Sequence, residues 1–397
     1  MLSKQRREAL IALCQRAIQI PSFSGEEEGV AKLLRDTMTA YGFDQVEIDR
    51  YGSVLGQIKG RRPGKTILMD GHIDTVGLPD PGRWTHDPFG GEIADGRLYG
   101  RGASDMKGSV TAMISAAAHF AQDTNRDFAG EVWVSCSVHE ECFEGVSARA
   151  ISQRVKPDFV IIGEATSATL KIGQRGRAEV VVETVGTSCH SSNPERGCNA
   201  VYPMCAIIDA IRALVPETHP VLGPGIFELT DICSSPYPGA SVVPESCRVT
   251  YDHRLLVGET EEQVLSTVGQ VVQAAVRRVN LPGLRAKVAL AEGSARCWTG
   301  ETIHAKRFFP AWLLEPDHEL VVKARAGLKA AGIDAPLSHF AFCTNGSHFC
   351  GEAGIPTIGF GPSLEELAHT VDEYIALDQL TLACEGFAGI LQALTGP

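Results

Sequence analysis

Three short apolar runs constrain the fold of this chain more than any other feature. They read "KTILMDG", "GEVWVSCSVHEE" and "PDFVIIGEA", have the length of strands and are rich in β-branched residues. Because they are apolar on both faces, they predict strands of a sheet that helices cover on both sides. The stretch "KGSVTAMISAAAHFAQ", which follows Met106, predicts one such helix. Together these segments indicate an α/β fold.

A second pattern begins after about Gly176. Six segments follow in the order strand, helix, strand, strand, helix, strand, which is the split βαββαβ unit of a ferredoxin-like domain. A chain of 397 residues is too long for one typical core, so two domains are expected. We therefore predict a large α/β domain over residues 1–175 and 291–397, with a smaller domain, residues 176–290, inserted into it.

The first residues predict two helices. Ser3 is placed to cap a helix that Pro21 stops. Ser24 is expected to begin a second helix, with acidic side chains in its first turn, and Gly42 to end it. In the last part of the chain we expect a short strand at "IPTIGFG" and a final helix that begins at Leu377.

Charge and composition exclude several classes of partner. The chain carries 36 Lys and Arg against 48 Asp and Glu, a formal net charge of −12, which argues against nucleic acid and anionic membranes. No stretch is apolar enough to predict a membrane span or the core of a signal peptide, so we expect a cytoplasmic protein. The 12 cysteines include no C-x-x-C pair and predict small buried side chains rather than a metal site.

Polar side chains stand where the predicted strands end. His72 and Asp74 would project to the same side of one strand end, where a carboxylate can fix the tautomer of a metal-binding imidazole. Glu140, Glu141 and Glu164 follow the next two strands. Two adjacent carboxylates repel each other unless a cation or a proton intervenes, although solvent exposure is an equally ordinary explanation. Taken singly, each residue is explained by structure alone.

Two further residues favour a shared function over a separate structural explanation for each residue. Asp105 lies in the glycine-rich stretch "YGRGASDMKG", where it could be only a helix cap, and His369 lies far along the chain in "EELAHTVDEYI". Because an open α/β sheet gathers its carboxyl strand ends on one edge, all these residues can meet there. Asp, Glu and His are the ligand set of a two-metal site. The glycine-rich stretch lacks G-x-G-x-x-G, so a nucleotide-binding oxidoreductase is a weaker alternative.

The order of these motifs resembles the zinc peptidase and deacylase family of acetylornithine deacetylase, succinyl-diaminopimelate desuccinylase, aminoacylase and glutamate carboxypeptidase. The resemblance extends from about residue 5 to residue 395. The shared blocks are "GHIDTV", "WTHDPFGGEIADGRLYGRGASDMKG", "HEE", "GEAT", "GQRGRAEVVVETVGTSCHSSNPERGCNA" and "AHTVDEYI". Other loops, such as "FCTNGSHFC", are most similar to a bacterial branch of selenium-metabolism-linked hydrolases, and no substrate is carried over from the named enzymes.

The resemblance implies a metal centre with two divalent ions, which are expected to be zinc, with cobalt or manganese as alternatives. His72 and Glu164 would bind one ion, and Glu141 and His369 would bind the other. Asp105 would bridge the two. The fold implied is the family's catalytic domain with an inserted lid, through which the chain would form a homodimer.

The resemblance also implies roles outside the metal ligands. Glu140 would be the general base that takes a proton from the metal-bridging water, and Asp74 would orient His72. His190 would reach the partner subunit's site and polarise the scissile carbonyl. Arg254 would contact a substrate carboxylate. A nucleophilic serine beside His190 is conceivable, but no G-x-S-x-G elbow surrounds it.

Two more residues are candidates for substrate binding. Ser241, in "GASVVP", stands where the family often has an asparagine that helps to hold substrate. Asn345 is expected in a tight Asn-Gly turn of the substrate-side loop. The activity expected is hydrolysis of an amide bond in a dipeptide or N-acyl amino acid. The alternative is a catalytically silent metal- or ligand-binding protein on the same fold.

Overall fold

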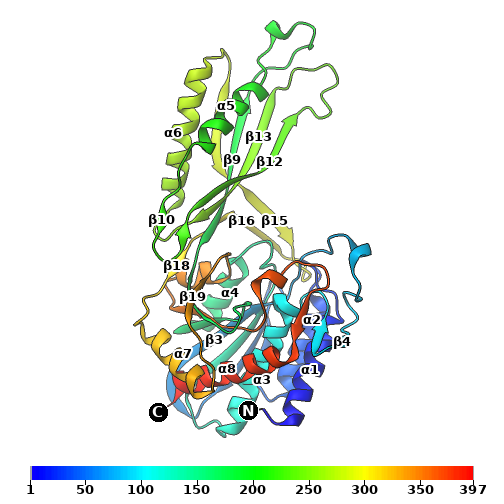
Figure 1. Ribbon diagram of the computed structural model, residues 1–397, viewed down its shortest axis with the longest axis vertical. Helices are drawn as coiled ribbons and strands as arrows, with labels where there is room; N and C mark the ends of the chain where they lie inside the picture. The colour runs from blue at the N-terminus through cyan, green and yellow to red at the C-terminus, as the bar shows by residue number, and fades with distance from the viewer. Residues whose placement is uncertain (1, 397) are drawn as a thin grey trace. The chain divides into compact units, whose positions relative to one another are not determined.

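The computed structural model describes residues 2–396, which form two compact units (Figure 1). The first unit extends to Gln174 and adds Ser294–His304 and the chain from Trp312 onward. The second unit comprises Arg175–Gly293 and Ala305–Ala311. The sequence placed residues 305–311 in the larger domain. The structure places them in the second unit, because β17 (Phe308–Phe309) pairs with a strand of that unit.

Among the described residues, a mixed sheet of nine strands forms the centre of the first unit. Eight strands follow one another in the order β1-β2-β6-β3-β7-β20-β8-β18, and β19 pairs with β8. Their bounds are β1 Gln45–Ile48, β2 Val54–Lys59, β3 Arg62–His72, β6 Ala129–Ser137, β7 Phe159–Ile162, β8 Leu170–Gln174, β18 Trp312–Leu313, β19 Leu337–Phe340 and β20 Thr357–Gly359.

The three apolar runs of the sequence are the central strands β6, β3 and β7, as predicted. These strands run parallel, and β20 continues the parallel set beside β7. Both faces of the sheet are covered. Ile67 and Met69 of β3 belong to the larger core, whereas Leu68 between them belongs to a separate cluster on the other face. The prediction of a doubly covered α/β sheet is therefore confirmed.

Helices from distant parts of the sequence cover this sheet (Figure 1). One face packs against α1, α3, α7 and α8, and the other packs against α4. A further helix, α2, contacts β1 and β2. The helix bounds are α1 Lys4–Ile18, α2 Glu28–Ala40, α3 Gly108–Asp123, α4 Val146–Val155, α7 Glu319–Ala330 and α8 Leu377–Thr395.

The two N-terminal helices form, but one of them begins later than predicted. Ser3 caps α1 and accepts a hydrogen bond from the backbone N–H of Arg6, as expected. The second helix begins at Glu28, and Ser24 lies outside it. The Ser24 hydroxyl instead donates to the carboxylate of Asp74 at 2.7 Å. The prediction of Ser24 as the start of this helix is wrong because that long-range hydrogen bond uses its side chain.

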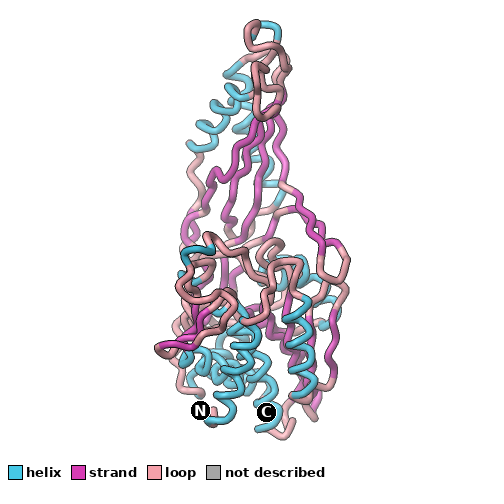
Figure 2. The backbone as a smooth tube through the Cα atoms, turned by 90° about the vertical axis from the view of Figure 1, so that its right-hand side faces the viewer, coloured by secondary structure: helices cyan, strands magenta, loops and turns pink. Residues whose placement is uncertain are grey.

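The second unit has the predicted order of elements. Its sheet runs β12-β13-β9-β14, and two helices contact one another and this sheet. The tube in Figure 2 shows helix (cyan) running along these strands (magenta). Inward residues of β9 alternate with partly exposed ones, which is the pattern of a sheet covered on one face. The bounds are β9 Gly176–Val185, α5 Val201–Arg212, β12 Ile226–Ser235, β13 Ser246–Leu255, α6 Glu261–Val279 and β14 Arg285–Leu290.

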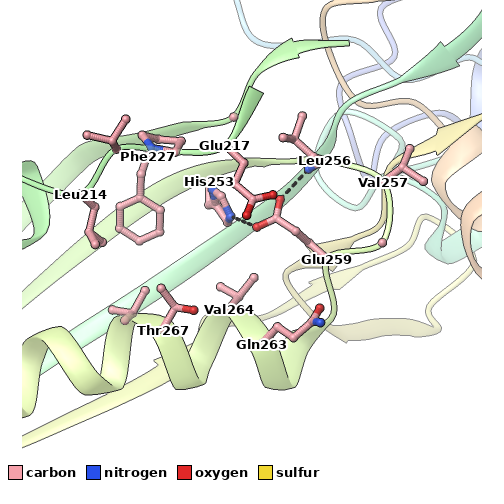
Figure 3. A pocket seen from close by; sticks show the side chains of 15 residues that line it. Leu214, Glu217, Phe227, His253, Leu256, Val257, Glu259, Gln263, Val264 and Thr267 are labelled. Atoms are coloured by element: carbon pink, nitrogen blue, oxygen red, sulfur yellow. Dashed lines mark hydrogen bonds and ion pairs between the residues drawn. The ribbon is translucent and has the colours of Figure 1, made fainter. Parts of the chain in front are cut away.

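The second unit also contains a cavity of about 600 Å³. Figure 3 shows Phe227, His253 and Glu259 above α6, with Val264 and Thr267 of that helix below them. The residues that line this cavity include none of those predicted to act on substrate. Along residues 2–396, no helix combines the length and the apolar character that crossing a bilayer requires.

Candidate metal centre

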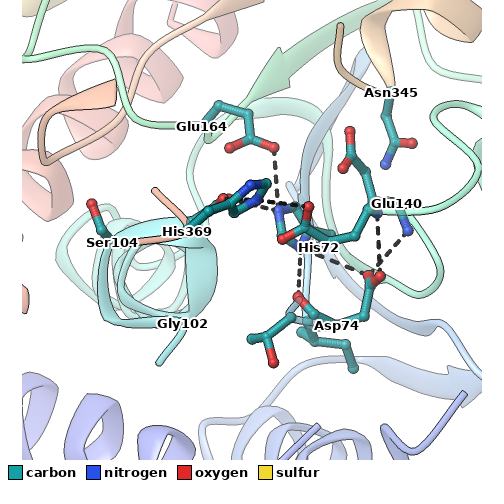
Figure 4. A network of polar contacts seen from close by, with 12 residues as sticks. His72, Asp74, Gly102, Ser104, Glu140, Glu164, Asn345 and His369 are labelled. Atoms are coloured by element: carbon teal, nitrogen blue, oxygen red, sulfur yellow. Dashed lines mark hydrogen bonds and ion pairs between the residues drawn. The ribbon is translucent and has the colours of Figure 1, made fainter. Parts of the chain in front are cut away.

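Parallel strands bring the predicted metal ligands to one edge of the first unit's sheet. His72 is the last residue of β3, Glu140 and Glu141 follow the end of β6, and Glu164 follows the end of β7. Because these strands are parallel neighbours, their carboxyl ends meet at the same edge. Asp105 comes from the turn that precedes α3. Figure 4 shows His72, Glu140, Glu164 and His369 converging there.

Asp105 lies between two imidazoles. Its Oδ1 atom is 3.0 Å from Nε2 of His72, and its Oδ2 atom is 3.2 Å from Nε2 of His369. A second carboxylate lies near the same nitrogen of each histidine: Glu164 Oε1 is 3.4 Å from His72 Nε2, and Glu141 Oε2 is 3.0 Å from His369 Nε2. The carboxylate of Asp105 therefore connects two imidazole–carboxylate pairs, which is the arrangement that a bridging ligand needs.

Burial makes this cluster of carboxylates costly without a cation. It raises the pKa of Glu140 well above its usual value. Burial, with the negative charge of Asp105, raises the pKa of Glu141 to about 7. The same two influences raise the pKa of Glu164 to about 8, although His72 acts in the opposite direction. Several carboxylates in so small a volume need protons or metal ions between them.

The pKa values of the two histidines are also raised, which in an imidazole favours the charged form. Burial lowers the pKa of His72, but Glu164 and Asp105 outweigh it, so the pKa lies well above its usual value. Hydrogen bonds with Asp105 and Glu141 raise the pKa of His369 to about 10. Burial raises the pKa of Asp105, but its bonds with both imidazoles lower it further than burial raises it. The cluster thus holds cations against carboxylates, the charge pattern that a divalent metal ion can replace.

The donor set fits zinc, cobalt or manganese. Imidazole nitrogens and carboxylate oxygens are ligands that these ions accept. Potential ligand atoms of His72, Glu140 and Glu164 lie within 4.8 Å of one another, as do those of His72, Asp105 and Glu141. Within residues 2–396, the buried Oε1 atoms of Glu140 and Glu141 have no hydrogen-bond partner. Buried carboxylate oxygens without protein partners are suited to binding a metal ion or a water molecule.

The orientation of His72 favours metal binding. Its Nδ1 atom lies 2.8 Å from the backbone oxygen of Asp74. Because a carbonyl oxygen only accepts, Nδ1 carries the hydrogen, and in the neutral ring Nε2 then presents its lone pair to the cluster. The sequence assigned this orienting role to the carboxylate of Asp74. That carboxylate is 3.7 Å from Nδ1, too far for a hydrogen bond, so the backbone oxygen is the partner.

The carboxylate of Asp74 holds a different part of the site. Its Oδ1 accepts the backbone N–H of Glu140 at 3.0 Å, and its Oδ2 accepts that of Glu141 at 3.2 Å. The Ser24 hydroxyl donates to the same Oδ2. Asp74 therefore fixes the backbone from which both glutamates project. Sequence reasoning missed Ser24, because a hydroxyl 50 residues from its partner gives no local signal.

The structure contradicts two local conformations that the sequence suggested, a helix cap at Asp105 and a tight turn at Asn345. Asp105 is not a helix cap: α3 begins at Gly108, the preceding position is Lys107, and no side-chain hydrogen bond caps that end within the described chain. Asn345 is not in a tight Asn-Gly turn. Gly346 has right-handed helical angles, and the pair leads into the helical turn Ser347–Glu352.

The side chain of Asn345 is engaged inside the protein. Its amide nitrogen donates to Asp70 Oδ2 and to Ser137 Oγ, both at 2.9 Å, and its oxygen accepts the backbone N–H of Gly145 at 2.8 Å. Both amide hydrogens are thus occupied. Asn345 is suited to supporting the strand ends beneath the metal ligands, and this geometry counts against the predicted role as a substrate contact.

The remaining predicted residues lie in the second unit. His190 is exposed and pairs through the backbone with Val242, next to Ser241, whose backbone oxygen accepts the N–H of Ser191 at 2.9 Å. His190 and Ser241 are therefore neighbours. Arg254 lies in β13, and its Nε donates to Asp252 at 2.7 Å.

The tautomer of His190 is determined by its own loop. The backbone N–H of Ser192 donates to Nδ1 of His190 at 3.2 Å, and the hydroxyl of the same serine lies 2.8 Å from that atom. An atom that accepts a backbone N–H cannot carry a hydrogen itself, so Nε2 carries it. His190 thus presents a hydrogen-bond donor to solvent.

Comparison with known proteins identifies the family. The sequence model of peptidase family M20/M25/M40 matches residues 68–393. The chain belongs to this family. It is 35% identical over 382 residues to the Escherichia coli (strain K12) protein YgeY, covering 94% of this chain and 91% of that one. It is 34% identical over 281 residues to succinyl-diaminopimelate desuccinylase 2 of Ruegeria sp. (strain TM1040), covering 67% and 70%.

Solved structures of M20 proteins share the fold. Human carnosine dipeptidase 1 superimposes with a TM-score of 0.73 at 16% identity, covering 98% of this chain and 96% of that one. The YXEP protein of Bacillus subtilis, described as a dinuclear metal-binding peptidase of family M20, gives a TM-score of 0.71 at 14% identity, with 98% of both chains covered. The predicted family and fold are confirmed. As a member of family M20, the chain is a metal-dependent amidohydrolase.

Proposed function

We propose that this M20 protein hydrolyses an amide bond in a dipeptide or an N-acyl amino acid, using two divalent metal ions, with zinc as the expected metal. The observation that carries the proposal is the position of Asp105 between His72 and His369, with a further carboxylate beside each imidazole. The relatives support the substrate class, because they include proteins named desuccinylase and dipeptidase.

In this proposal His72 and Glu164 would hold one ion, Glu141 and His369 would hold the other, and Asp105 would supply a ligand oxygen to each. Bound there, the ions would lower the pKa of a water molecule to about 7 and polarise the carbonyl of the substrate. Such ions would also take the place of the protons that the metal-free cluster holds, so their binding should release protons.

Glu140 would act as the general base. It is buried, its Oε1 atom has no partner within the described chain, and its backbone is fixed by Asp74. Burial raises the pKa of its carboxyl, which suits a group that takes a proton from water and then passes it to the leaving nitrogen. A carboxylate that binds no metal and has a free oxygen can carry that proton between the two steps.

His190 would stabilise the negative charge that develops on the carbonyl oxygen. Its Nε2–H is the free donor that this role requires. We further propose that the second unit is a lid and dimerisation domain, and that His190 serves the site of a partner subunit. Arg254 would contact a carboxylate of the substrate, with Ser241 beside His190 helping to hold the substrate.

The experiment that tests the proposal combines metal analysis with activity. The protein should bind two equivalents of zinc, and a panel of dipeptides and N-acyl amino acids should reveal turnover that a chelator abolishes and zinc, cobalt or manganese restores. Turnover that is unaffected by thorough removal of metal would refute the proposal. Two bound ions without turnover of any compound in the panel would instead favour the catalytically silent alternative.

A further inference from the structure

A buried ion pair lies behind the proposed bridging ligand. Nη1 of Arg101 is 2.5 Å from Oε2 of Glu373, and the two side chains are 1% and 0% exposed. Neither residue is part of the proposed metal coordination. Burying two charges is expensive, and such a pair by itself is weak evidence of a contribution to stability. Its further contacts indicate what it does.

The carboxylate of Glu373 binds the backbone of the turn that carries Asp105. Its Oε1 accepts the N–H of Ser104 at 2.8 Å and that of Asp105 at 3.0 Å, and its Oε2 accepts that of Gly102 at 3.1 Å. With Arg101, four hydrogen bonds therefore converge on two oxygens. Figure 4 shows Gly102 and Ser104 beside the cluster. The turn is wrapped around one buried carboxylate.

The same carboxylate belongs to the segment that supplies the other bridged ligand. His369 lies four residues before Glu373 and has a positive φ of 62°, a conformation that non-glycine residues rarely adopt. Between them, Asp372 accepts hydrogen bonds from the backbone N–H and hydroxyl of Thr85 at 2.8 and 2.6 Å. Thr85 therefore fixes the segment at Asp372, and Glu373 joins the segment to the turn that carries Asp105.

We propose that Arg101 and Glu373 are positioning residues for the metal centre. Glu373 fixes the backbone of Asp105 so that its two carboxylate oxygens face His72 and His369, and Arg101 keeps Glu373 in place as an acceptor. This inference rests on the proposed function, because it assigns the pair a role in binding both metal ions. Groups that orient metal ligands typically affect metal affinity by about 10–100-fold.

The test uses Glu373→Gln in the 397-residue chain. The amide replaces one accepting oxygen with an N–H donor, so at least one of the turn's N–H groups loses its partner. We expect the affinity for zinc, measured by competition with a chelator, to fall by about 10–100-fold. The absorption spectrum of the cobalt-loaded protein should also change, because the coordination around Asp105 changes.

A second measurement needs no metal. In the metal-free protein, the backbone N–H groups of Gly102, Ser104 and Asp105 should exchange with solvent at least about tenfold faster in Glu373→Gln than in the wild type. N–H groups in the centres of β3 and β6 should keep their rates. This pattern separates a local release of the turn from a general loss of stability.

Asp49 provides a matched control. Its Oδ1 accepts three backbone N–H groups, those of Tyr51, Gly52 and Ser53, at 2.9, 2.8 and 2.9 Å. That loop carries none of the proposed ligands. Asp49→Ala removes that oxygen, so it should speed exchange in its own loop and leave zinc affinity and the cobalt spectrum unchanged.

The outcomes are distinct. Unchanged zinc affinity and an unchanged cobalt spectrum in Glu373→Gln would overturn the positioning role. If the wild type bound no metal, the proposed function would fail, and unchanged exchange at the turn would then overturn the inference separately. If Glu373→Gln did not fold, Arg101→Lys decides: it keeps the charge with fewer donors, so zinc affinity should fall several-fold, and an affinity equal to the wild type would overturn the proposal.

Discussion

The two units differ in how their proposed functional residues are held. In the first unit, the predicted ligands contact one another directly, and two of them lie inside the protein: His72 is 1% exposed and Glu164 is 4% exposed. In the second unit, His190 and Ser241 are exposed, and their contacts come from their own loops. From this difference we expect the first unit to determine metal binding. Residues of the second unit should affect turnover without changing metal affinity.

The largest expected effect is a loss of turnover when the proposed base of the first unit is replaced, with both metal ions still bound. Glu140→Gln should lower kcat by about 10²–10⁴-fold, because the amide cannot accept the proton of the attacking water. The bond from its backbone N–H to Asp74 should keep the side chain in position, so two metal ions should remain bound. Steady-state kinetics with metal analysis measures both. The control is Glu47→Gln in β1, a strand that carries none of the proposed site residues. Undiminished activity in Glu140→Gln would show that another group is the base.

The second prediction tests the division of roles from the other unit. His190→Ala should lower kcat by about 10²–10³-fold, the effect typical of removing one donor to an oxyanion. Zinc affinity should not change. A drop in zinc affinity would contradict the comparison, because it would make an exposed residue of the second unit part of the metal centre.

His219 is a suitable control for His190. It lies in the same unit, and its Nδ1 also accepts backbone N–H groups, those of Val221 and Leu222, both at 3.2 Å. His219→Ala should therefore reproduce any local effect of losing such an imidazole and leave kcat unchanged. Mixing His190→Ala with Glu140→Gln protomers adds a test of the proposed dimer. Activity regained in the mixture would show that the two residues act across subunits.

Much of the fold could be predicted from the sequence, because long elements carry strong patterns. The central strands and the βαββαβ order follow from apolar periodicity. The short pairings could not be predicted. β18 has only two residues, and β17, which takes residues 305–311 into the second unit, has two as well. At that length, neighbours in space decide the conformation, and a local pattern contains no information about them.

For the site, the sequence could indicate which residues converge but not which contacts they make. The residues that converge could be selected from motifs, because a parallel sheet brings its strand ends together whatever the details. The partners of each side chain could not. Asp74 was expected to hold His72 through its carboxylate, but the backbone oxygen does so, and the carboxylate holds the next strand end. Asn345 was expected to face substrate but lies among buried strand ends. Such contacts join residues 66 and 275 positions apart.

The third prediction tests whether the carboxylate of Asp74 holds the backbone of Glu140 and Glu141. Asp74→Asn replaces one of the two accepting oxygens with a donor, so the N–H of Glu140 or that of Glu141 loses its partner and that glutamate should shift. We expect zinc affinity and kcat each to fall by about 10–100-fold. Ser24→Ala removes a single hydrogen bond to Asp74 and should cost about fivefold at most, equivalent to roughly 1 kcal/mol. Equal effects of the two variants would contradict the backbone-holding role, since only Asp74→Asn disturbs it directly.

The smallest expected effect concerns a charged pair of the second unit that should influence stability alone. Nε2 of His253 lies 3.0 Å from Oε1 of Glu259 beside the cavity of that unit. Burial lowers the pKa of His253, but Glu259 and the backbone oxygen of Ile226 raise it further than burial lowers it. Burial raises the pKa of Glu259, yet its bonds with His253 and with the N–H of Leu256 bring it below its usual value.

The sign of the pH dependence follows from these directions. The stabilisation through His253 is fully present below the pKa of the unfolded chain and is lost as the pH rises through the raised pKa. The part due to Glu259 is present above its unfolded pKa and is lost as the pH falls through the lowered one. Glu259→Gln should thus lower the free energy of unfolding by about 0.2–1 kcal/mol near pH 5.5 and by less near pH 9. Urea unfolding at the two pH values measures this, while zinc affinity and kcat should stay at the wild-type values. An effect on zinc affinity here would contradict the separation of roles between the two units as directly as the same result for His190→Ala.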